Sequence, residues 1–246
     1  MRDYRDEFDR RVAFIRDIVE RAHVRGIVYG NSGGKDCTLV GILCKAACDD
    51  TVGVIMPCAS KRNYESDTDD ALAAARQFGI ETRTVDLTAA RAALLEQLAP
   101  ATEMTGAAEA NIAPRLRMTA LYAIAGSENR LVAGTGNRSE AYMGYFTKWG
   151  DGAYDFDPIA DLTATEVIEF LKFLNAPKSI TEKAPSAGLY EGQTDEKEMG
   201  ISYAAIDAYL LRGTAAPEDL AVIKRYHAGS EHKRRPVPTY QRYDTE

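Results

Sequence analysis

A short apolar run that leads into two adjacent glycines and then a helix-forming run constrains the fold of this chain most strongly. Ile27-Val28-Tyr29 precedes Ser32-Gly33-Gly34-Lys35-Asp36-Cys37, and a helix-compatible run starts at Thr38. Paired glycines let the backbone turn tightly, and the free N–H groups of the following helix attract an anion such as phosphate. Asp36 would repel phosphate unless Mg²⁺ lay between them. The pattern predicts a strand, a phosphate-binding loop and a helix, although an ordinary glycine-rich turn would fit the same residues.

Predicted strands and helices alternate over the first half of the chain. Short apolar or alternating runs predict strands at Ile27–Tyr29, Thr51–Met56, Glu81–Asp86 and Arg130–Gly134. Apolar spacing and stop signals predict helices at Phe8–Val24, Thr38–Cys48, Asp67–Phe78, Ala89–Ala99, Asn111–Ala125, Tyr203–Leu211 and Glu218–Tyr226. This order is typical of an α/β domain in which helices cover both faces of a parallel sheet. A capping box at residues 163–166 begins one more helix, and residues 135–161 and 183–199 are predicted to be loops.

Length, charge and cysteine content exclude several classes of protein. The 246 residues show no repeat and no linker, so we expect a single domain over residues 1–246. The net charge of −7 argues against a nucleic-acid-binding protein. Without a long apolar run or a signal peptide, we expect a cytoplasmic protein that does not bind membranes. Cys37, Cys44 and Cys48 share a helix face, where free thiols are favoured over a zinc site because no C-x-x-C pair or histidine accompanies them.

Several motifs resemble those of the ammonia-dependent NAD⁺ synthetases, which belong to the N-type ATP pyrophosphatases. The S-G-G-x-D-S loop of that superfamily, which cleaves ATP between its α and β phosphates, is present here with Cys37 as its last residue. The other matching segments are Arg115–Met118, Gly134–Glu140, Gly144–Gly152, Lys183–Ala187, Gly192–Glu196, Gly200–Tyr203 and Glu231–Arg235. The resemblance spans residues 25–238 and implies a parallel, five-stranded, Rossmann-like sheet with helices on both faces.

The resemblance also implies the reaction that completes NAD biosynthesis. ATP would activate the carboxylate of nicotinic acid adenine dinucleotide (deamido-NAD) as an acyl adenylate, and ammonia would then displace AMP to give NAD⁺. Bringing two polyanions together needs metal and cationic groups. Only about 25 residues precede the first strand, too few for the amidase domain of glutamine-dependent relatives, so free ammonia is expected. The family further implies a homodimer, for which helix Asn111–Ala125 would supply the interface.

Individual residues take roles from the family pattern. The implied ATP-binding residues are Gly30, Asn31, Ser32, Gly33, Gly34, Lys35, Asp36, Cys37, Thr135 and Ser186. Asp36 and Glu140 would hold Mg²⁺. The implied deamido-NAD contacts are Arg115, Lys148, Asp155, His232 and Lys233, and the implied catalytic residues are Asp151, Lys148, Ser32 and Asp36, with Asp151 close to the reacting carboxylate and ammonium.

Plainer explanations exist for several of these residues when each is taken alone. Thr135 fits a helix cap, and Asp151 fits a residue that shapes a glycine turn. Glu140 and Arg115 fit solvated helix charges, and the terminal His-Lys pair at residues 232–233 fits a frayed tail.

Two departures from the family pattern leave other functions open. A thiol at Cys37 is a weaker hydrogen-bond donor than the usual serine hydroxyl. Ala164 stands where many relatives have a lysine that reaches the ATP phosphates. Both departures fit a nucleotide-binding module that senses ATP without catalysis. The same loop also occurs in tRNA lysidine synthetases and tRNA thiolases, which usually carry an appended RNA-binding region that this acidic chain lacks.

Overall fold

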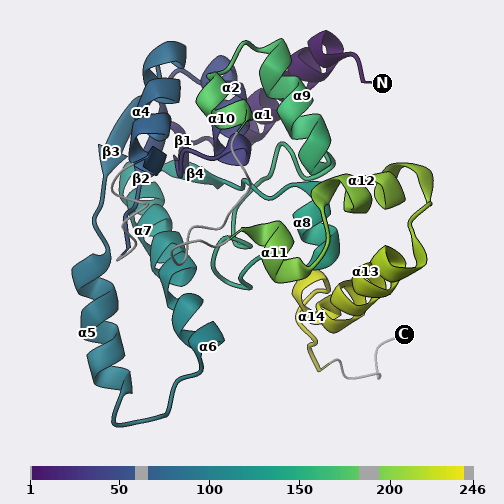
Figure 1. Cartoon of the computed structure of the whole chain (residues 1–246). Coiled ribbons are helices and arrows are strands. Elements are labelled where there is room, and N and C mark those ends of the chain that lie inside the picture. The colour runs from purple at the N-terminus through teal and green to yellow at the C-terminus, as the bar shows by residue number, and fades with distance from the viewer. Residues whose placement is uncertain (1, 59–65, 183–193, 241–246) are drawn as a thin grey trace, which may run out of the picture.

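A parallel sheet with helices on both faces forms the centre of the fold (Figure 1). The computed structural model describes residues 2–58, 66–182 and 194–240. The strands are β1 (Gly26–Gly30), β2 (Thr51–Ile55), β3 (Glu81–Thr84) and β4 (Arg130–Ala133). They are ordered β3-β2-β1-β4, and every pair is parallel. The four strands located in the sequence and the α/β class are confirmed.

The helices follow the predicted order with shifted ends. The longer helices are α1 (Tyr4–Ala22), α2 (Lys35–Ala47), α4 (Ser66–Phe78), α5 (Thr88–Leu98), α7 (Ile112–Glu128), α9 (Ala164–Phe173), α12 (Tyr203–Arg212) and α13 (Pro217–Gly229). The short ones are α6 (Gly106–Ala110), α8 (Arg138–Met143), α10 (Lys178–Thr181), α11 (Asp195–Met199) and α14 (Glu231–Arg234). The capping box at Thr163 and Glu166 begins α9 as predicted. Two expected loops contain helices instead, since α8 and α11 lie in stretches too short to show an apolar period.

The two faces of the sheet carry separate apolar clusters. Ile27 and Tyr29 of β1 belong to the cluster that includes residues of α1, α2 and α9. Val28, between them, points the opposite way and belongs to the cluster with residues of β2 and α7. Side chains alternate between the faces of a strand, and a parallel sheet covered on both faces is therefore apolar at consecutive positions. The predicted helical layers on both faces are confirmed.

The prediction of five strands was wrong, because the sheet of the described residues has four. The segment after α8 reaches β4 but makes only one parallel bridge, between Ala133 and Phe156. On one side of the bridge, the side chain of Asp155 accepts the N–H of Val132 at 2.7 Å. On the other side, the side chain of Asp157 accepts the N–H of residue 136 at 3.1 Å. Carboxylates thus take the donors that a fifth strand would need for its ladder.

A buried carboxylate joins three helices, α8, α9 and α12. Asp207 of α12 accepts the hydroxyl of Ser139 in α8 at 2.5 Å. Its other oxygen accepts the N–H and the hydroxyl of Thr165, at 2.8 and 2.6 Å, in the first turn of α9. A negative charge is favourable there because the free N–H groups of a helix point out of its first turn. Asp207 therefore ties α12 to the helix that carries Glu140.

Replacing Asp207 with alanine is expected to destabilise the whole protein. The buried hydroxyl of Ser139 and two donors of the exposed Thr165 would lose their acceptor, and a buried donor without an acceptor costs about 1–3 kcal/mol. We expect a loss of roughly 2 kcal/mol or more in the free energy of unfolding, measured by urea denaturation. Asp219→Ala, in the first turn of α13, removes an acidic residue without this network and serves as control. Equal midpoints for Asp207→Ala and wild type would contradict this account.

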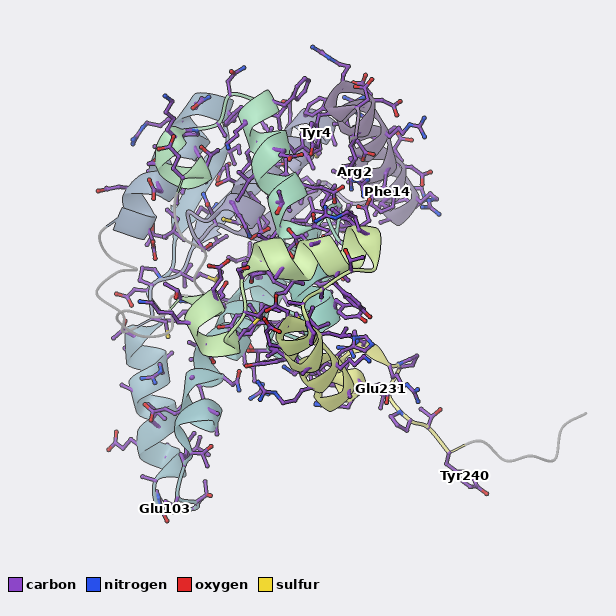
Figure 2. All side chains as sticks on the ribbon, turned by 45° about the vertical axis from the view of Figure 1, so that its right-hand side comes forward. Arg2, Tyr4, Phe14, Glu103, Glu231 and Tyr240 are labelled. Atoms are coloured by element: carbon purple, nitrogen blue, oxygen red, sulfur yellow. The ribbon has the colours of Figure 1, made fainter. Side chains whose placement is uncertain are left out.

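The N-terminal helix is tied to the segment that follows the bridge to β4. Arg2 donates to Asp161 at 2.9 Å and to Glu166 at 2.8 Å, while Arg11 donates to Asp161 at 2.6 Å. Figure 2 shows Arg2 and Tyr4 at the opposite end of the molecule from Glu103, which lies at the tip of the arm that α5 and α6 form. Within the described parts of the chain, no helix has the length and hydropathy that crossing a membrane requires.

Candidate functional site

A pocket of about 1020 Å³ opens at the carboxyl ends of β1 and β4. The chain runs outward from β1 through β2 to β3, whereas β4 lies on the other side of β1. Parallel α/β sheets bind ligands where the strand order reverses in this way, because the loops diverge there. Gly30 and Asn31 line the pocket after β1, and Gly134 and Thr135 line it after β4. Topology therefore brings the two main sequence motifs together in one cavity.

The glycine loop after β1 leads directly into α2. Gly33 has φ +75°, and its N–H donates to the side-chain oxygen of Asn31 at 3.3 Å. Ser32 accepts the N–H of Gly34 at 3.4 Å. The first turn of α2 then presents its N–H groups to the pocket, where an anion is favoured. The predicted strand, loop and helix are confirmed.

The unusual cysteine of the loop is held inside it. The sulfur of Cys37 lies 3.2 Å from the hydroxyl of Ser32 and donates to the carbonyl of Gly34 at 3.2 Å. Burial raises the pKa of the Cys37 thiol, so the sulfur stays protonated at neutral pH. Cys37 therefore stabilises the loop from within and is no reactive thiolate.

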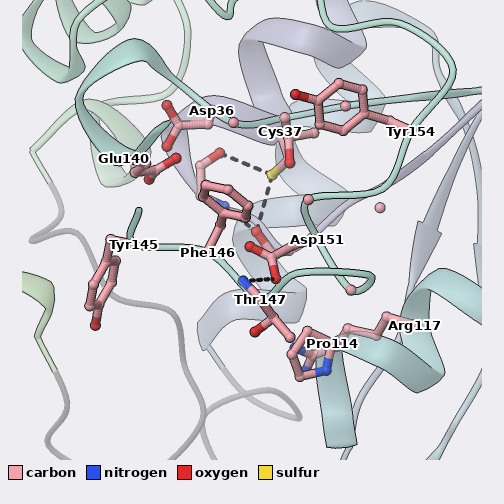
Figure 3. Close-up of a pocket in the computed structure, with 18 of the residues that line it drawn as sticks. Asp36, Cys37, Pro114, Arg117, Glu140, Tyr145, Phe146, Thr147, Asp151 and Tyr154 are labelled. Atoms are coloured by element: carbon pink, nitrogen blue, oxygen red, sulfur yellow. Dashed lines mark hydrogen bonds between the residues drawn. The ribbon is translucent and has the colours of Figure 1, made fainter. Parts of the chain in front are cut away.

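Asp36 and Glu140 lie side by side on one wall of the pocket, from α2 and α8 (Figure 3). The fully buried Asn137 holds both of them. Its side-chain amide donates to Asp36 at 3.0 Å, and its backbone N–H donates to Glu140 at 3.1 Å. Burial raises the pKa of Glu140 well above its usual range, and the neighbouring charge of Asp36 acts in the same direction.

Lys35 lies behind the two carboxylates and is itself buried. Its ammonium is 2.5 Å from Asp36 and 5.5 Å from the ring centre of Tyr203. Burial disfavours the charge on Lys35, but Asp36 and Glu140 outweigh it, so the pKa of Lys35 is raised. The hydroxyl of Tyr203 donates to Asp195 at 3.1 Å. Lys35 thus remains a cation, shared among carboxylates that outnumber it.

The pair Asp36 and Glu140 fits a magnesium ion. Burial and the charge of Asp36 both raise the pKa of Glu140, and a bound divalent cation would relieve both effects. Mg²⁺ is usually held by one or two carboxylates, with water and substrate phosphates as its other ligands. Among residues 2–58, 66–182 and 194–240, no cluster of three or more metal-ligating side chains occurs. The arrangement therefore suits an ion that arrives with phosphate better than a structural ion.

Asp151 lies on the floor of the same pocket (Figure 3). Its carboxylate accepts the N–H of Thr147 at 3.0 Å. Asp151 is exposed to solvent, yet the protein packed around it raises its pKa, against the effect of the Thr147 N–H. A Cβ on Gly152 would lie 3.3 Å from the Thr147 carbonyl and would overlap the ring of Phe146. The glycine is therefore required by the close packing of this turn.

Lys233 fixes one side of that turn from the C-terminal helix α14. Its ammonium donates to the carbonyls of Gly144 and Phe146, at 2.7 and 2.6 Å. Burial lowers the pKa of Lys233, and the charge of Asp151 opposes that effect. Lys233 lines the pocket, where a substrate contact was predicted. The hydrogen bonds that it makes in this structure hold the segment that precedes Asp151.

Other predicted substrate contacts surround the pocket without lining it. The ammonium of Lys148 donates to the carbonyl of His232 at 2.9 Å. Arg115 is exposed on α7 and donates to the carbonyl of Lys148 at 3.4 Å. Tertiary structure thus gathers three distant segments into one basic rim beside the floor at Asp151.

One further residue of the predicted site, and the position where relatives have a lysine, do not line the pocket. Asp155 is exposed, accepts the hydroxyl of Tyr122 at 3.2 Å and does not line the pocket. Ala164 is buried in the apolar cluster of α8 and α12, so its side chain offers nothing to a nucleotide. Ser186 lies outside the described residues.

Sequence reasoning missed four residues that shape the pocket. Asn137 had a local signal, because Asn137-Arg138-Ser139-Glu140 has the spacing of a capping box, and the structure contains that box. Thr147, Asp195 and Tyr203 had no such signal, because their contacts join segments that only the tertiary fold brings together.

The chain is similar in sequence to known proteins. The model of the family described as NAD synthase matches residues 7–237. The NH(3)-dependent NAD(+) synthetase of Carboxydothermus hydrogenoformans is 45% identical over 95% of this chain and 96% of its own length. That of Alkaliphilus oremlandii is 43% identical over 94% of this chain and 95% of its own.

The fold is also similar to those of solved structures. The NMN synthetase of Francisella tularensis superposes with a TM-score of 0.92 at 36% identity, over 98% of this chain and 99% of that one. The NH3-dependent NAD synthetase of Campylobacter jejuni superposes with a TM-score of 0.80 at 28% identity, over 98% and 100%.

Proposed function

This chain belongs to the NAD synthase family, and we propose that its pocket converts deamido-NAD to NAD⁺ with ATP and ammonia. AMP and pyrophosphate are the other products. One observation carries the proposal: the phosphate loop and Asp151 line a single cavity, so ATP and the carboxylate it activates can meet there. The enzyme is a ligase that forms a carbon–nitrogen bond.

The phosphate side of the pocket binds and orients ATP. Ser32, Gly34 and the first turn of α2 present donors to the phosphates, and Lys35 adds a fixed positive charge. Asp36 and Glu140 hold Mg²⁺, which when bound neutralises phosphate charge. The substrate carboxylate attacks the α-phosphorus, the bond to the bridging oxygen breaks, and pyrophosphate leaves. The chain contributes orientation and charge to this step.

The basic rim binds the second substrate, deamido-NAD, which is an anion. Lys148 and Arg115 lie where they can neutralise its phosphate or carboxylate groups, and the His232-Lys233 pair lies next to them. Cationic groups held by backbone carbonyls lose little further freedom when an anion binds, which favours affinity. Lys233 also keeps the floor of the pocket in place.

Asp151 is the residue that receives ammonium. Its negative charge attracts NH₄⁺, and its raised pKa makes it a better proton acceptor than an ordinary aspartate. Loss of one proton frees the nitrogen lone pair, which attacks the acyl carbon of the adenylate. AMP leaves with the electrons of the broken acyl–oxygen bond, and a further proton leaves the nitrogen as the amide forms.

A homodimer would account for the residues outside the pocket. Asp155 and Arg115 are exposed beside α7, and α5 next to it has no fully buried residue. A second copy packed on this side would cover α7 and make these residues available to the far half of a dinucleotide. The molecular mass in solution tests this arrangement, and a stable monomer at assay concentration would exclude it.

A second candidate substrate is nicotinic acid mononucleotide. The observation in its favour is the TM-score of 0.92 with a protein described as an NMN synthetase. The chemistry would be unchanged, because the same nicotinate carboxylate is activated and amidated. The mononucleotide is smaller than the dinucleotide, so it would fit in the pocket without a contact to Asp155, which lies outside it.

Product analysis separates these possibilities. The purified chain is mixed with ATP, Mg²⁺ and ammonium, and with either acid in parallel reactions. NAD⁺ and AMP in equal amounts from deamido-NAD support the first proposal, and a much higher kcat/KM for the mononucleotide supports the second. ATP binding without AMP from either acid would refute both and favour the nucleotide sensor or a tRNA substrate.

A further inference from the structure

Asp157 uses both of its carboxylate oxygens to hold backbone next to the pocket. One oxygen accepts the N–H of Gly136 at 3.1 Å, and the other accepts the N–H of Ile159 at 3.0 Å. The side chain is half-buried and does not line the cavity. It therefore touches no substrate, but it fixes the turn that leaves β4.

That turn carries the residue which organises the acidic wall. Gly136 immediately precedes Asn137, whose side chain donates to Asp36 at 3.0 Å and whose N–H donates to Glu140 at 3.1 Å. Thr135, on the other side of Gly136, lines the pocket. Any movement of Gly136 is therefore passed to both carboxylates through one buried residue, Asn137.

Other ionisable groups face Asp157 from two directions. Asp36 and Cys44 of α2 interact with it electrostatically. From its own segment, Tyr154 and Asp161 do the same, and Arg11 of α1 is bound to Asp161. Burial raises the pKa of Asp157 to about 7, with Asp36 and Asp161 acting in the same direction.

We propose that Asp157 is a positioning residue that keeps the Asp36–Asn137–Glu140 group in the geometry that binds the ATP phosphates. A protonated carboxyl has one oxygen that is a donor, and this oxygen cannot accept an N–H well. Protonation of Asp157 therefore releases Gly136 or Ile159 and loosens the turn. The inference deepens the proposed function, because it concerns the same ATP site.

The test compares the binding of Mg²⁺ with α,β-methylene-ATP, which is not cleaved, to wild type and to Asp157→Asn. Asparagine is uncharged and offers one acceptor oxygen, as the protonated acid does. At about pH 8 we expect the variant to bind about 10-fold more weakly, the effect of one lost hydrogen bond to a charged group. At about pH 6 the two proteins should bind equally, because Asp157 is then protonated in wild type.

Asp161→Asn is the matched control. It removes a charge from the same segment but no acceptor of the Gly136 turn. Its affinity should therefore still fall as the pH drops, as in wild type, but at a lower pH, because the charge of Asp161 raises the pKa of Asp157. A ratio of affinities between wild type and Asp157→Asn that is near one at about pH 8, or that does not change down to about pH 6, would overturn the proposal.

Hydrogen exchange of the Gly136 amide gives a second measurement that needs no variant. Its protection in wild type, corrected for the intrinsic rate, should fall about 10-fold as Asp157 becomes protonated. Unchanged protection would contradict the proposed role even if Asp157→Asn failed to fold. Failure of the proposed function is distinct, because wild type would then bind the analogue but form no amide from either acid.

Discussion

Asp151→Asn is expected to lower the rate of amide formation about 100-fold or more, the usual contribution of a positioned general base. The amide of asparagine has nearly the shape of the carboxylate and still accepts the N–H of Thr147, which it meets at 3.0 Å in wild type. It carries no charge to attract ammonium, however, and it cannot accept a proton. The loss should therefore fall on the ammonia step alone.

Two assays locate the affected step. Exchange of labelled pyrophosphate into ATP, without ammonium, reports formation of the adenylate and should stay within a few-fold of wild type. Amide formation with saturating ammonium should be lost. Because only ionised Asp151 can act, the rate that it supports falls as the pH drops through its raised pKa. Asp49→Asn, a fully exposed carboxylate beside Lys45, controls for the loss of one charge. Equal loss in both assays would place Asp151 before the ammonia step and contradict this role.

Gly33→Ala is expected to lower kcat/KM for ATP about 100-fold, as misplacement of a binding group by about an ångström does. Gly33 has φ +75°, which costs about 1–2 kcal/mol for any residue with a Cβ. The new Cβ would also overlap the carbonyl oxygen of Asp67 and lie 3.0 Å from the N atom of Ala71. Both atoms belong to the backbone of α4, so the phosphate loop has to move.

Two other glycines separate the causes. Gly34→Ala lies in the same loop without a positive φ, and its nearest neighbour would be the hydroxyl of Ser32 at 3.3 Å. It should change the midpoint of thermal unfolding little. Gly79→Ala has φ +66° with nothing within 4 Å, so it isolates the backbone strain, about 1–2 kcal/mol, without the overlap. If Gly33→Ala and Gly79→Ala unfold at the same temperature and Gly33→Ala keeps its activity, the contact with α4 is not important.

The parts of the fold that local interactions stabilise could be predicted from the sequence. The four strands, the loop after Tyr29 and the capping box of Thr163 and Glu166 each have a sequence signal within a few neighbouring residues, although the strands then pair with distant ones. The absence of a fifth strand could not be predicted. It depends on the side chains of Asp155 and Asp157, which accept N–H groups of Val132 and Gly136, more than 20 residues earlier in the chain. A count of strands taken from a family pattern misses such a competition.

The site divides in the same way. Resemblance named Asp36, Glu140 and Asp151, and all three line one pocket in the fold. It also named Asp155, which lies outside that pocket, since the alternation of side chains along a nearly extended segment turns neighbours to opposite sides. Asn137, which joins Asp36 to Glu140, had a role that no family motif stated.

By itself, the sequence determined the chemistry available to this protein: a phosphate loop, two separate motifs that each carry one carboxylate and a basic C-terminal segment, each encoded within a few neighbouring residues. The tertiary structure alone decided which of these groups meet. The reversal of strand order between β1 and β4 places two distant loops at one cavity. Contacts across long stretches of chain, such as Lys233 to Gly144, then set their geometry. Those contacts depend on packing and burial, which short-range sequence patterns do not specify.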